Sequence, residues 1–181
     1  MLHLIYAMTK HINKLFYSWL YIGYSRWAPG TMASLAAIPL CIMLNRFSNH
    51  FLKLSFILAF ILLSIMSAAI EQETSQTNDP GYIVIDEVAG MLIATYFVMK
   101  SFAFDTTQIT QYISAFIFFR LFDIWKPYPI SILDKKSKTS DTPLKRGIYI
   151  VLDDVLAGIF SCALFYIGMK LFWFYLRHSS N

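Results

Sequence analysis

The chain has 181 residues, of which 57% are hydrophobic, 17% aromatic and only 14% charged, and its mean hydropathy is +0.53. Soluble domains contain roughly 45–50% apolar and about 25% charged residues, which excludes an ordinary water-soluble globule and makes a membrane the expected solvent. The net charge of +4 favours anionic lipid over nucleic acid, because neither a helix-turn-helix pattern nor an aromatic platform accompanies the basic residues.

Five apolar runs, taken in chain order, predict helices. They cover residues 32–44, 54–70, 88–99, 106–119 and 155–176. The second and the last reach the roughly 17 residues that a crossing needs, and the others are shorter. Helix and turn signals stand at one end of each run, at Pro29-Gly30 with Thr31 as a cap, at 79–81, at Pro127 and Pro129, and at Gly147. We expect an all-α fold, a multi-helix membrane-embedded bundle that forms one domain over residues 1–181.

If these runs cross the bilayer in turn, the polar segments fall on two sides. Residues 29–31, 71–87 and 120–154 share one side, whereas the other side holds Arg46, Lys53, Lys100, Asp105 and Arg177. The first side contains the acidic clusters and a basic loop with Lys135, Lys136, Lys138, Lys145 and Arg146. The positive-inside rule makes that side cytoplasmic. Because carboxylates beside hydrocarbon mark functional sites, we expect a composite acidic site at the cytoplasmic end of the bundle.

Residues 28–34 form the first candidate part of that site. Pro29 and Gly30 open a helix whose free N–H groups, together with the hydroxyls of Thr31 and Ser34, suit an anion such as phosphate. Ordinary helix capping explains the same residues. Only the expected position beside the acids favours a phosphate cradle.

Asp86 and Glu87 form the second part, just before the apolar run 88–99. Both carboxylates are expected in or just before the first turn of a helix, where the helix dipole favours negative charge. Capping accounts for the pair alone, whereas metal binding accounts for it together with the other acids. Asp79 precedes the pair in a polar loop, and the pattern does not decide its role.

Arg120, Asp123 and Lys126 form the third part. Their spacing of three places them along one helix face before Pro127 ends the helix. A ladder of surface ion pairs would contribute only about 0.2–0.5 kcal/mol per pair. Beside a bilayer we favour a site in which Asp123 binds a metal while Arg120 and Lys126 hold phosphate oxygens.

Asp153 and Asp154 form the fourth part. Adjacent helical residues point about 100° apart, and two such acids repel each other unless a cation compensates both. This pattern indicates Mg²⁺, which takes oxygen ligands and keeps several waters. Gly158, one turn later, would let another helix approach closely. The alternative is a solvated helix start.

The sequence contains no candidate histidine or cysteine nucleophile in a recognisable catalytic motif. The four histidines, at positions 3, 11, 50 and 178, lie near the termini or in the expected far-side loop, and none has a GxSxG motif or a cysteine nearby. Cys41 and Cys162 both lie in apolar runs, without a disulfide framework or a zinc-binding CxxC pair.

The four parts together resemble the phosphatidylglycerophosphatase A family of bacterial membranes. The likeness lies in APGTMAS at 28–34, DPG at 79–81 with IVIDEVAG at 83–90, FRLFDIWKPYPI at 119–130, and DDVLAG at 153–158. Their order and spacing match from about residue 20 to residue 160. Two departures concern the first motif, where Ala33 replaces an expected glycine and Arg26 an expected proline. A methyl at Ala33 fits only if its φ is negative, and Arg26 is a candidate for an added phosphate contact.

The resemblance implies an inner-membrane, Mg²⁺-dependent lipid phosphatase that converts phosphatidylglycerophosphate to phosphatidylglycerol. It assigns metal-binding or catalytic roles to Asp86, Glu87, Asp123, Asp153 and Asp154. It assigns phosphate contacts to Thr31, Ser34, Arg120 and Lys126.

Two mechanisms and two rival functions stay open at this point. Either a metal-activated water attacks phosphorus with a carboxylate as base, or one of Asp86, Asp123 and Asp153 attacks to form an aspartyl-phosphate. A transporter or ion-coupled channel would also use intramembrane carboxylates, but no inverted repeat is visible. Transfer of a phospho-alcohol from a CDP-lipid ranks third, because the Asp-Gly and Ala-Arg series of such enzymes is missing.

Overall fold

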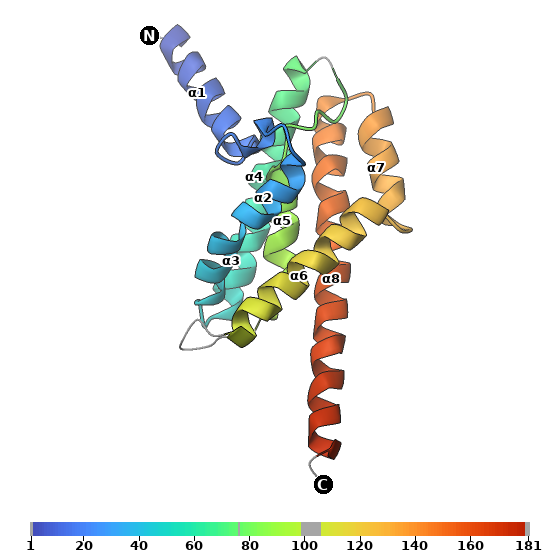
Figure 1. Ribbon diagram of the computed structural model, residues 1–181. Coiled ribbons are helices and arrows are strands. Elements are labelled where there is room, and N and C mark those ends of the chain that lie inside the picture. Colours follow the sequence, from blue (N-terminus) through green and yellow to red (C-terminus); the bar gives the residue numbers. More distant parts are fainter. Residues whose placement is uncertain (1, 76, 99–105, 180–181) are drawn as a thin grey trace.

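The computed structural model describes residues 2–75, 77–98 and 106–179 (Figure 1). Within these ranges the regular structure is entirely helical, as the apolar runs predict. The elements in chain order are α1 (Leu2–Tyr17), the 3-10 helix η1 (Ile22–Tyr24), α2 (Pro29–Ala36), α3 (Ile38–Asn45), α4 (His50–Thr74), α5 (Ile85–Ala94), α6 (Thr106–Trp125), α7 (Ile130–Thr139) and α8 (Pro143–Ser179).

The helices α4 and α8 are the two long apolar elements. Their most apolar stretches, in His50–Thr74 and Pro143–Phe172, have mean hydropathies of 2.2 and 2.0, so both are long and apolar enough to cross a membrane. In Figure 1, α8 extends beyond the other helices towards the C-terminus. The other three runs lie in shorter or less apolar helices, so five crossings remain a prediction. Met99, Lys100 and Asp105, which that topology used, lie outside the described residues.

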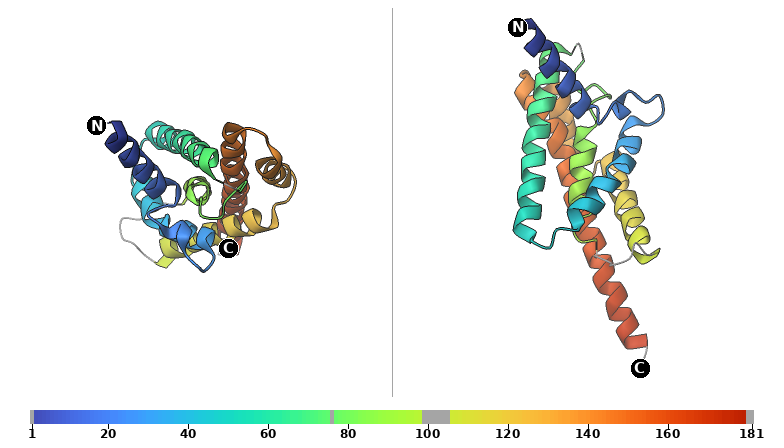
Figure 2. Two further views of the ribbon diagram at one scale, coloured as in Figure 1. Left: turned by 90° about the horizontal axis from the view of Figure 1, so that it is seen from above. Right: turned by 90° about the vertical axis from the view of Figure 1, so that its left-hand side faces the viewer.

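The short helix α5 lies at the centre of the bundle. Seen from above in Figure 2, it is enclosed by its neighbours, and it packs most extensively against α8. Eight of its ten residues are buried, including Val88, Gly90 and Leu92. At about 1.5 Å per residue it spans roughly 15 Å, half the thickness of a bilayer core. The helix is therefore a buried core element whose first turn is held well inside the molecule.

Glycines explain how closely α5 and α8 approach each other. A Cβ added to Gly158 of α8 would lie 2.5 Å from the backbone oxygen of Gly90, and one added to Gly90 would lie 2.8 Å from the backbone oxygen of Asp154. Neither position has room for a methyl group. The close approach predicted for Gly158 is thus present, and its partner is α5.

Two predicted helix boundaries differ from the structure. Gly147 does not end a helix but lies inside α8. A Cβ at this position would lie 2.7 Å from the backbone nitrogen of Ala69, so the glycine allows α8 to pack closely against α4. Thr31 does not cap α2, because Pro29 opens the helix and Ala28, at φ 38°, holds the cap position without a side-chain hydrogen bond. In addition, the run 32–44 is divided between α2 and α3.

Candidate active site

A polar cavity of about 300 Å³ lies where the N-terminus of α5, the C-terminus of α6 and the middle of α8 meet. Eight charged side chains line it: Asp79, Asp86, Glu87, Arg120, Asp123, Lys126, Asp153 and Asp154. Seven of the nine predicted site residues are among them. The other two, Thr31 and Ser34, lie beside the cavity rather than in its lining.

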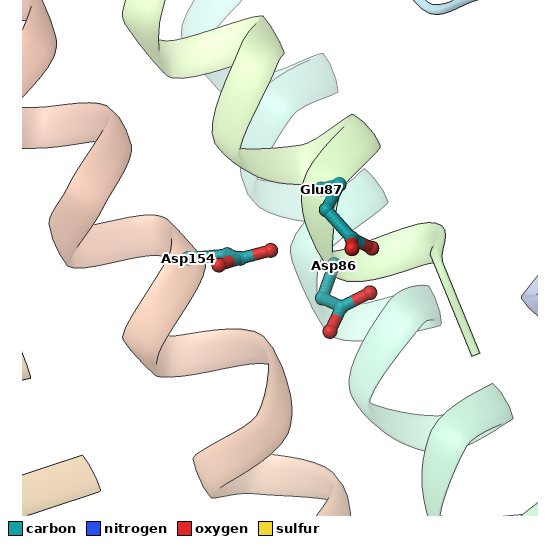
Figure 3. A group of neighbouring side chains, drawn as sticks. All are labelled: Asp86, Glu87 and Asp154. Atoms are coloured by element: carbon teal, nitrogen blue, oxygen red, sulfur yellow. The ribbon is translucent and has the colours of Figure 1, made fainter. Parts of the chain in front are cut away.

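Three carboxylates form the deepest group in the cavity. Asp86, Glu87 and Asp154 each place one oxygen within 4.8 Å of the other two, and Figure 3 shows them converging from α5 and α8. The oxygens Oδ1 of Asp86 and Oε2 of Glu87 are buried and have no hydrogen-bond partner in the described structure. Unpaired buried carboxylates are costly, and the three residues have the oxygen ligands and the spacing to hold a cation.

Glu87 is also held from the side of α2. A Cβ on Gly30 would collide with the Oε1 atom of Glu87. The first turn of α2 therefore approaches this carboxylate at a distance that only glycine permits. The APG turn thus contributes its backbone to the wall of the cavity, through Ala28, Pro29 and Gly30.

Arg120 is anchored on two sides. Its Nη1 atom lies 2.5 Å from Oδ2 of Asp123, one turn later in α6. The same nitrogen lies 3.5 Å from Oγ of Ser34, a buried hydroxyl that donates a hydrogen bond to the carbonyl of Gly30. The Nε atom of Arg120 is buried without a partner in the described structure. The guanidinium is thus fixed in place while part of its donor capacity remains for an anion.

Lys126 lies just past the end of α6, at φ 46°, and does not continue the stripe of Arg120 and Asp123. Its Nζ atom lies 2.7 Å from Oδ2 of Asp153 in α8 and 2.6 Å from Oδ1 of Asp134 in α7. Burial alone would lower the pKa of Lys126, but the Asp153 and Asp134 carboxylates raise it above its ordinary value. The expected one-face ladder is therefore wrong at Lys126, whose ammonium is charged and joins two further helices.

Asp134 does not line the cavity but holds the cavity residue Lys126, a role that the sequence pattern did not reveal. It stands in the basic loop region and reads there as one acid among lysines. In the structure it accepts hydrogen bonds from Lys126 and from Lys138, which lies 2.8 Å from its Oδ2. Burial would raise the pKa of Asp134, but these two ammonium groups lower it below its ordinary value. No spacing rule pairs residues 126 and 134, because the chain turns between α6 and α7.

Adjacent acids in α8 serve different parts of the cavity. Asp153 faces Lys126, whereas Asp154 joins Asp86 and Glu87. Both are buried and lie about three turns into the helix, which excludes a solvated helix start. Asp79, at φ 60° in the loop before α5, also lines the cavity, and burial raises its pKa. The unassigned acid of the DPG turn is therefore part of the same cavity.

Residues of the first motif take different positions. Thr31 lines an open groove next to Arg120, and Ser34 is completely buried behind the cavity wall. Ala33 is buried in α2 and is not among the residues with positive φ, as its methyl requires. Arg26 is exposed and does not line the cavity.

Comparison with known proteins identifies the family of this chain. Residues 15–169 match the family described as phosphatidylglycerophosphatase A. Proteins of that name from Escherichia coli (strain K12) and Haemophilus influenzae are 31% and 33% identical over 144 and 134 residues, covering 80% and 74% of this chain and 76% and 74% of theirs. A Bacteroides thetaiotaomicron protein named "Putative phosphatidylinositol-3-phosphatase" is 31% identical over 144 residues, 77% of this chain and 82% of its own.

No solved structure matches the chain. The family match covers all four motifs and every residue that lines the cavity. It favours a phosphatase over a transporter. The chain therefore belongs to the phosphatidylglycerophosphatase A family and is an enzyme of the phosphatase class.

Proposed function

We propose that this protein is a membrane-embedded, Mg²⁺-dependent phosphatase that hydrolyses the terminal phosphomonoester of phosphatidylglycerophosphate, leaving phosphatidylglycerol. The observation that carries the proposal is the cavity that holds a cluster of three carboxylates, two of them on buried residues, together with two anchored cations, Arg120 and Lys126. The names of the Escherichia coli and Haemophilus influenzae relatives supply the substrate.

The donor set fits a magnesium ion. Asp86, Glu87 and Asp154 offer only carboxylate oxygens, which hard divalent cations prefer, and two of those oxygens are buried without partners. Asp123 and Asp153 lie beside them but are each bonded to a cationic side chain. We assign the metal to Asp86, Glu87 and Asp154. Asp123 positions Arg120, and Asp153 positions Lys126; either aspartate can contact the metal as well. When bound, Mg²⁺ neutralises phosphate charge and acidifies water.

The basic side chains of the cavity bind the phosphate and stabilise its charge. Arg120 holds phosphate oxygens through its free donors, and Lys126 contributes a charged ammonium on the side of Asp153. Together they stabilise the charge that develops on the phosphoryl oxygens during an in-line displacement. Thr31 stands next to Arg120 at the entrance, whereas Ser34 acts on the phosphate only through Arg120.

Two routes for the displacement remain alternatives. In the first, a carboxylate takes a proton from water, the water oxygen bonds to phosphorus, the bond from phosphorus to the glycerol oxygen breaks, and the proton passes to that oxygen. In the second, Asp86, Asp123 or Asp153 attacks phosphorus, the bond from phosphorus to the glycerol oxygen breaks, and that oxygen takes a proton from a neighbouring carboxylic acid. Water then hydrolyses the aspartyl-phosphate and returns the proton to that acid. Trapping of labelled phosphate on acid-quenched protein distinguishes them, since only the second route leaves a covalent label.

The location that we propose is the bacterial inner membrane, with the cavity facing the cytoplasm. The two long apolar helices and the bacterial relatives support a membrane protein. The basic residues of α7 and of the start of α8 lie near the cavity, and the positive-inside rule places such residues in the cytoplasm.

The direct test is release of phosphate from phosphatidylglycerophosphate by the purified protein in mild detergent. We expect release with Mg²⁺, none with EDTA, and a loss of more than about 100-fold for Asp154→Asn and Asp153→Asn, because even outer-shell partners of a metal are worth about 10–100-fold. Asp141→Asn, in the exposed loop before α8, is the matched control and should retain full activity.

Thermal unfolding supplies a readout that does not depend on turnover. Mg²⁺ should raise the Tm of the wild-type protein, since a ligand that binds only the folded state stabilises it, and this rise should shrink in Asp154→Asn. Release from phosphatidylinositol 3-phosphate alone would contradict the proposed substrate. Full activity of Asp154→Asn in EDTA would contradict the metal site.

A further inference from the structure

An open apolar groove of about 690 Å³ runs along α6 beside the catalytic cavity. Seven residues line it: Thr31, Phe116, Ile117, Arg120, Leu121, Ile124 and Trp125. Apart from Thr31, they all belong to α6. Its lining is therefore one face of a single helix, bordered by the first turn of α2.

This face of α6 is apolar and largely exposed, and of its apolar residues only Phe116 packs against the core. Ile117, Leu121 and Ile124 follow the spacing of one helix face, and their exposed fractions are 54%, 51% and 72%. The opposite face carries Ala115 and Phe119, both completely buried in the core. A helix that is apolar on both faces is expected where its outer face contacts lipid rather than water.

The groove is continuous with the cavity. Arg120 lines both of them, and the neighbouring residues Gly30 and Thr31 line the cavity and the groove respectively. One molecule can therefore place a phosphate against Arg120 and extend an apolar part along α6. The lining is charged on the cavity side of Arg120 and apolar on the groove side. A phospholipid likewise has a charged head group followed by apolar acyl chains.

Two exposed tryptophans lie where the cavity meets the groove. Trp125, at the cavity end of the groove, is 71% exposed, and Trp27, next to the cavity residue Ala28, is 83% exposed. Tryptophan is enriched where a membrane meets water, at the depth of lipid head groups. A groove that starts at this depth and continues over isoleucine and leucine has the polarity profile of the bilayer beside it.

We propose that the groove along α6 binds the acyl-chain region of the phospholipid substrate and so positions its head group in the catalytic cavity. The proposal rests on the proposed function for its substrate. It makes Ile117 and Leu121 specificity-determining residues, because they contact the chain rather than the reacting phosphate. The lipid then enters sideways from the bilayer, between α2 and α6.

A second groove provides the matched control. It lies between α1 and α4, has a volume of about 340 Å³, and shares no residue with the catalytic cavity. Leu63, which lines it, is 54% exposed, the same fraction as Ile117. The substitutions Ile117→Gln and Leu63→Gln therefore introduce similar polarity at equally exposed sites, of which only one adjoins the cavity.

The kinetic test compares phosphatidylglycerophosphate with long acyl chains and the same head group on short, water-soluble chains. In Ile117→Gln the ratio of kcat/KM for the long over the short substrate should fall roughly tenfold, the loss expected when an apolar contact in a pocket is spoiled. Leu63→Gln should leave the ratio at its wild-type value, with unchanged Tm in both variants. An equal fall in both variants, or an unchanged ratio in Ile117→Gln, would overturn the proposal.

A crosslinking test separates failure of the groove from failure of the proposed function. Wild-type protein in vesicles receives trace phosphatidylglycerophosphate or phosphatidylcholine, each with a photoreactive acyl chain, and labelled peptides are identified by mass spectrometry. With Mg²⁺ present, excess labelling of α6 by the phosphomonoester lipid supports the groove whether or not that lipid is hydrolysed. Equal labelling by both lipids overturns the proposal. The mass of each protein in detergent is measured as well: a dimer for wild type and a monomer for Ile117→Gln would assign the groove to a second copy of the chain and would also overturn it.

Discussion

At the scale of single residues, the cavity is held together by charges that each serve two partners. Lys126 contacts Asp134 in α7 and Asp153 in α8. Arg120 contacts Asp123 within its own helix and Ser34 in α2. Partly buried ion pairs of this kind add little net stability when desolvation is counted. Their value lies in fixing two cationic groups at defined positions in the cavity.

Asp134 offers a test of this arrangement through pH. The pKa of Asp134 is lowered in the folded protein, so its carboxylate contributes stability above its ordinary pKa of about 3.9. That contribution is lost as the pH falls through the lowered value. Asp134→Asn should therefore reduce Tm at neutral pH by a few degrees, roughly what about 1 kcal/mol means for a chain of this length.

The measurement is thermal unfolding of both proteins in detergent, from neutral pH down to roughly pH 3. The gap in Tm should close in the acidic part of this range. Asp141→Asn, in the exposed loop, is the control and should show little gap throughout. A gap for Asp134→Asn that is constant with pH would show that the carboxylate charge is not its cause.

Sequence spacing predicts residue positions when the partner lies on the same helix. The placement of Asp86 and Glu87 in a first helical turn and the divergence of Asp153 and Asp154 both follow from helix geometry, and both are present. The pairing of Lys126 with Asp134 depends on the turn between two helices, which no periodicity encodes.

At the scale of helices, the crossing of α5 and α8 determines the geometry of the carboxylates. Gly90 lies one turn after Asp86 and Glu87, and Gly158 lies one turn after Asp154. Because the two glycines let the backbones touch, carboxylates one turn away come within a single ion's reach. The close packing of α5 against α8 therefore also brings the three carboxylates together.

Gly158→Ala should therefore destabilise the protein, since its methyl would meet the backbone oxygen of Gly90 at 2.5 Å. Overpacking of this kind costs about 1–3 kcal/mol. Gly168→Ala in the same helix is the control, because nothing lies within 4 Å of its added Cβ; it should be neutral or stabilising, as alanine is the better helix former by about 1 kcal/mol. Thermal unfolding of the two variants decides, and equal Tm values would refute the close-packing argument.

The sequence predicts helices better than it predicts where they end. Each of the five apolar runs contains a helix, but the run 88–99 is helical only as far as Ala94, where α5 ends. Gly147 reads as a helix breaker because the sequence does not show its packing against Ala69. The division of 32–44 into α2 and α3, just before Pro39, is a local event inside a uniformly apolar run. Tertiary contacts override the local signals in both cases.

At the scale of the whole molecule, the four motifs converge because every helix that carries one of them packs on α5. Figure 2 shows the ring of helices around this short central element. Alternating polar and apolar segments predict that the motifs meet, although the cavity lies at the middle of α8. The depth of the carboxylates is not, since it depends on a ten-residue helix buried on all sides.

The orientation of the bundle can be tested with one engineered cysteine. Lys138 is an exposed residue of α7, whereas Cys41 and Cys162 are both buried and should not react. In intact cells Lys138→Cys should resist a membrane-impermeant thiol reagent and should react once the membrane is opened. Labelling in intact cells would place the basic helix, and the cavity beside it, outside.

The charge balance of the cavity has a thermodynamic consequence. Six acidic side chains line it against two basic ones, and each basic one is already paired with an aspartate. A phosphate dianion entering such a cavity alone meets net repulsion, and a divalent cation bound beside it reduces that repulsion. Each must therefore raise the affinity for the other, and by thermodynamic linkage the two enhancements are equal.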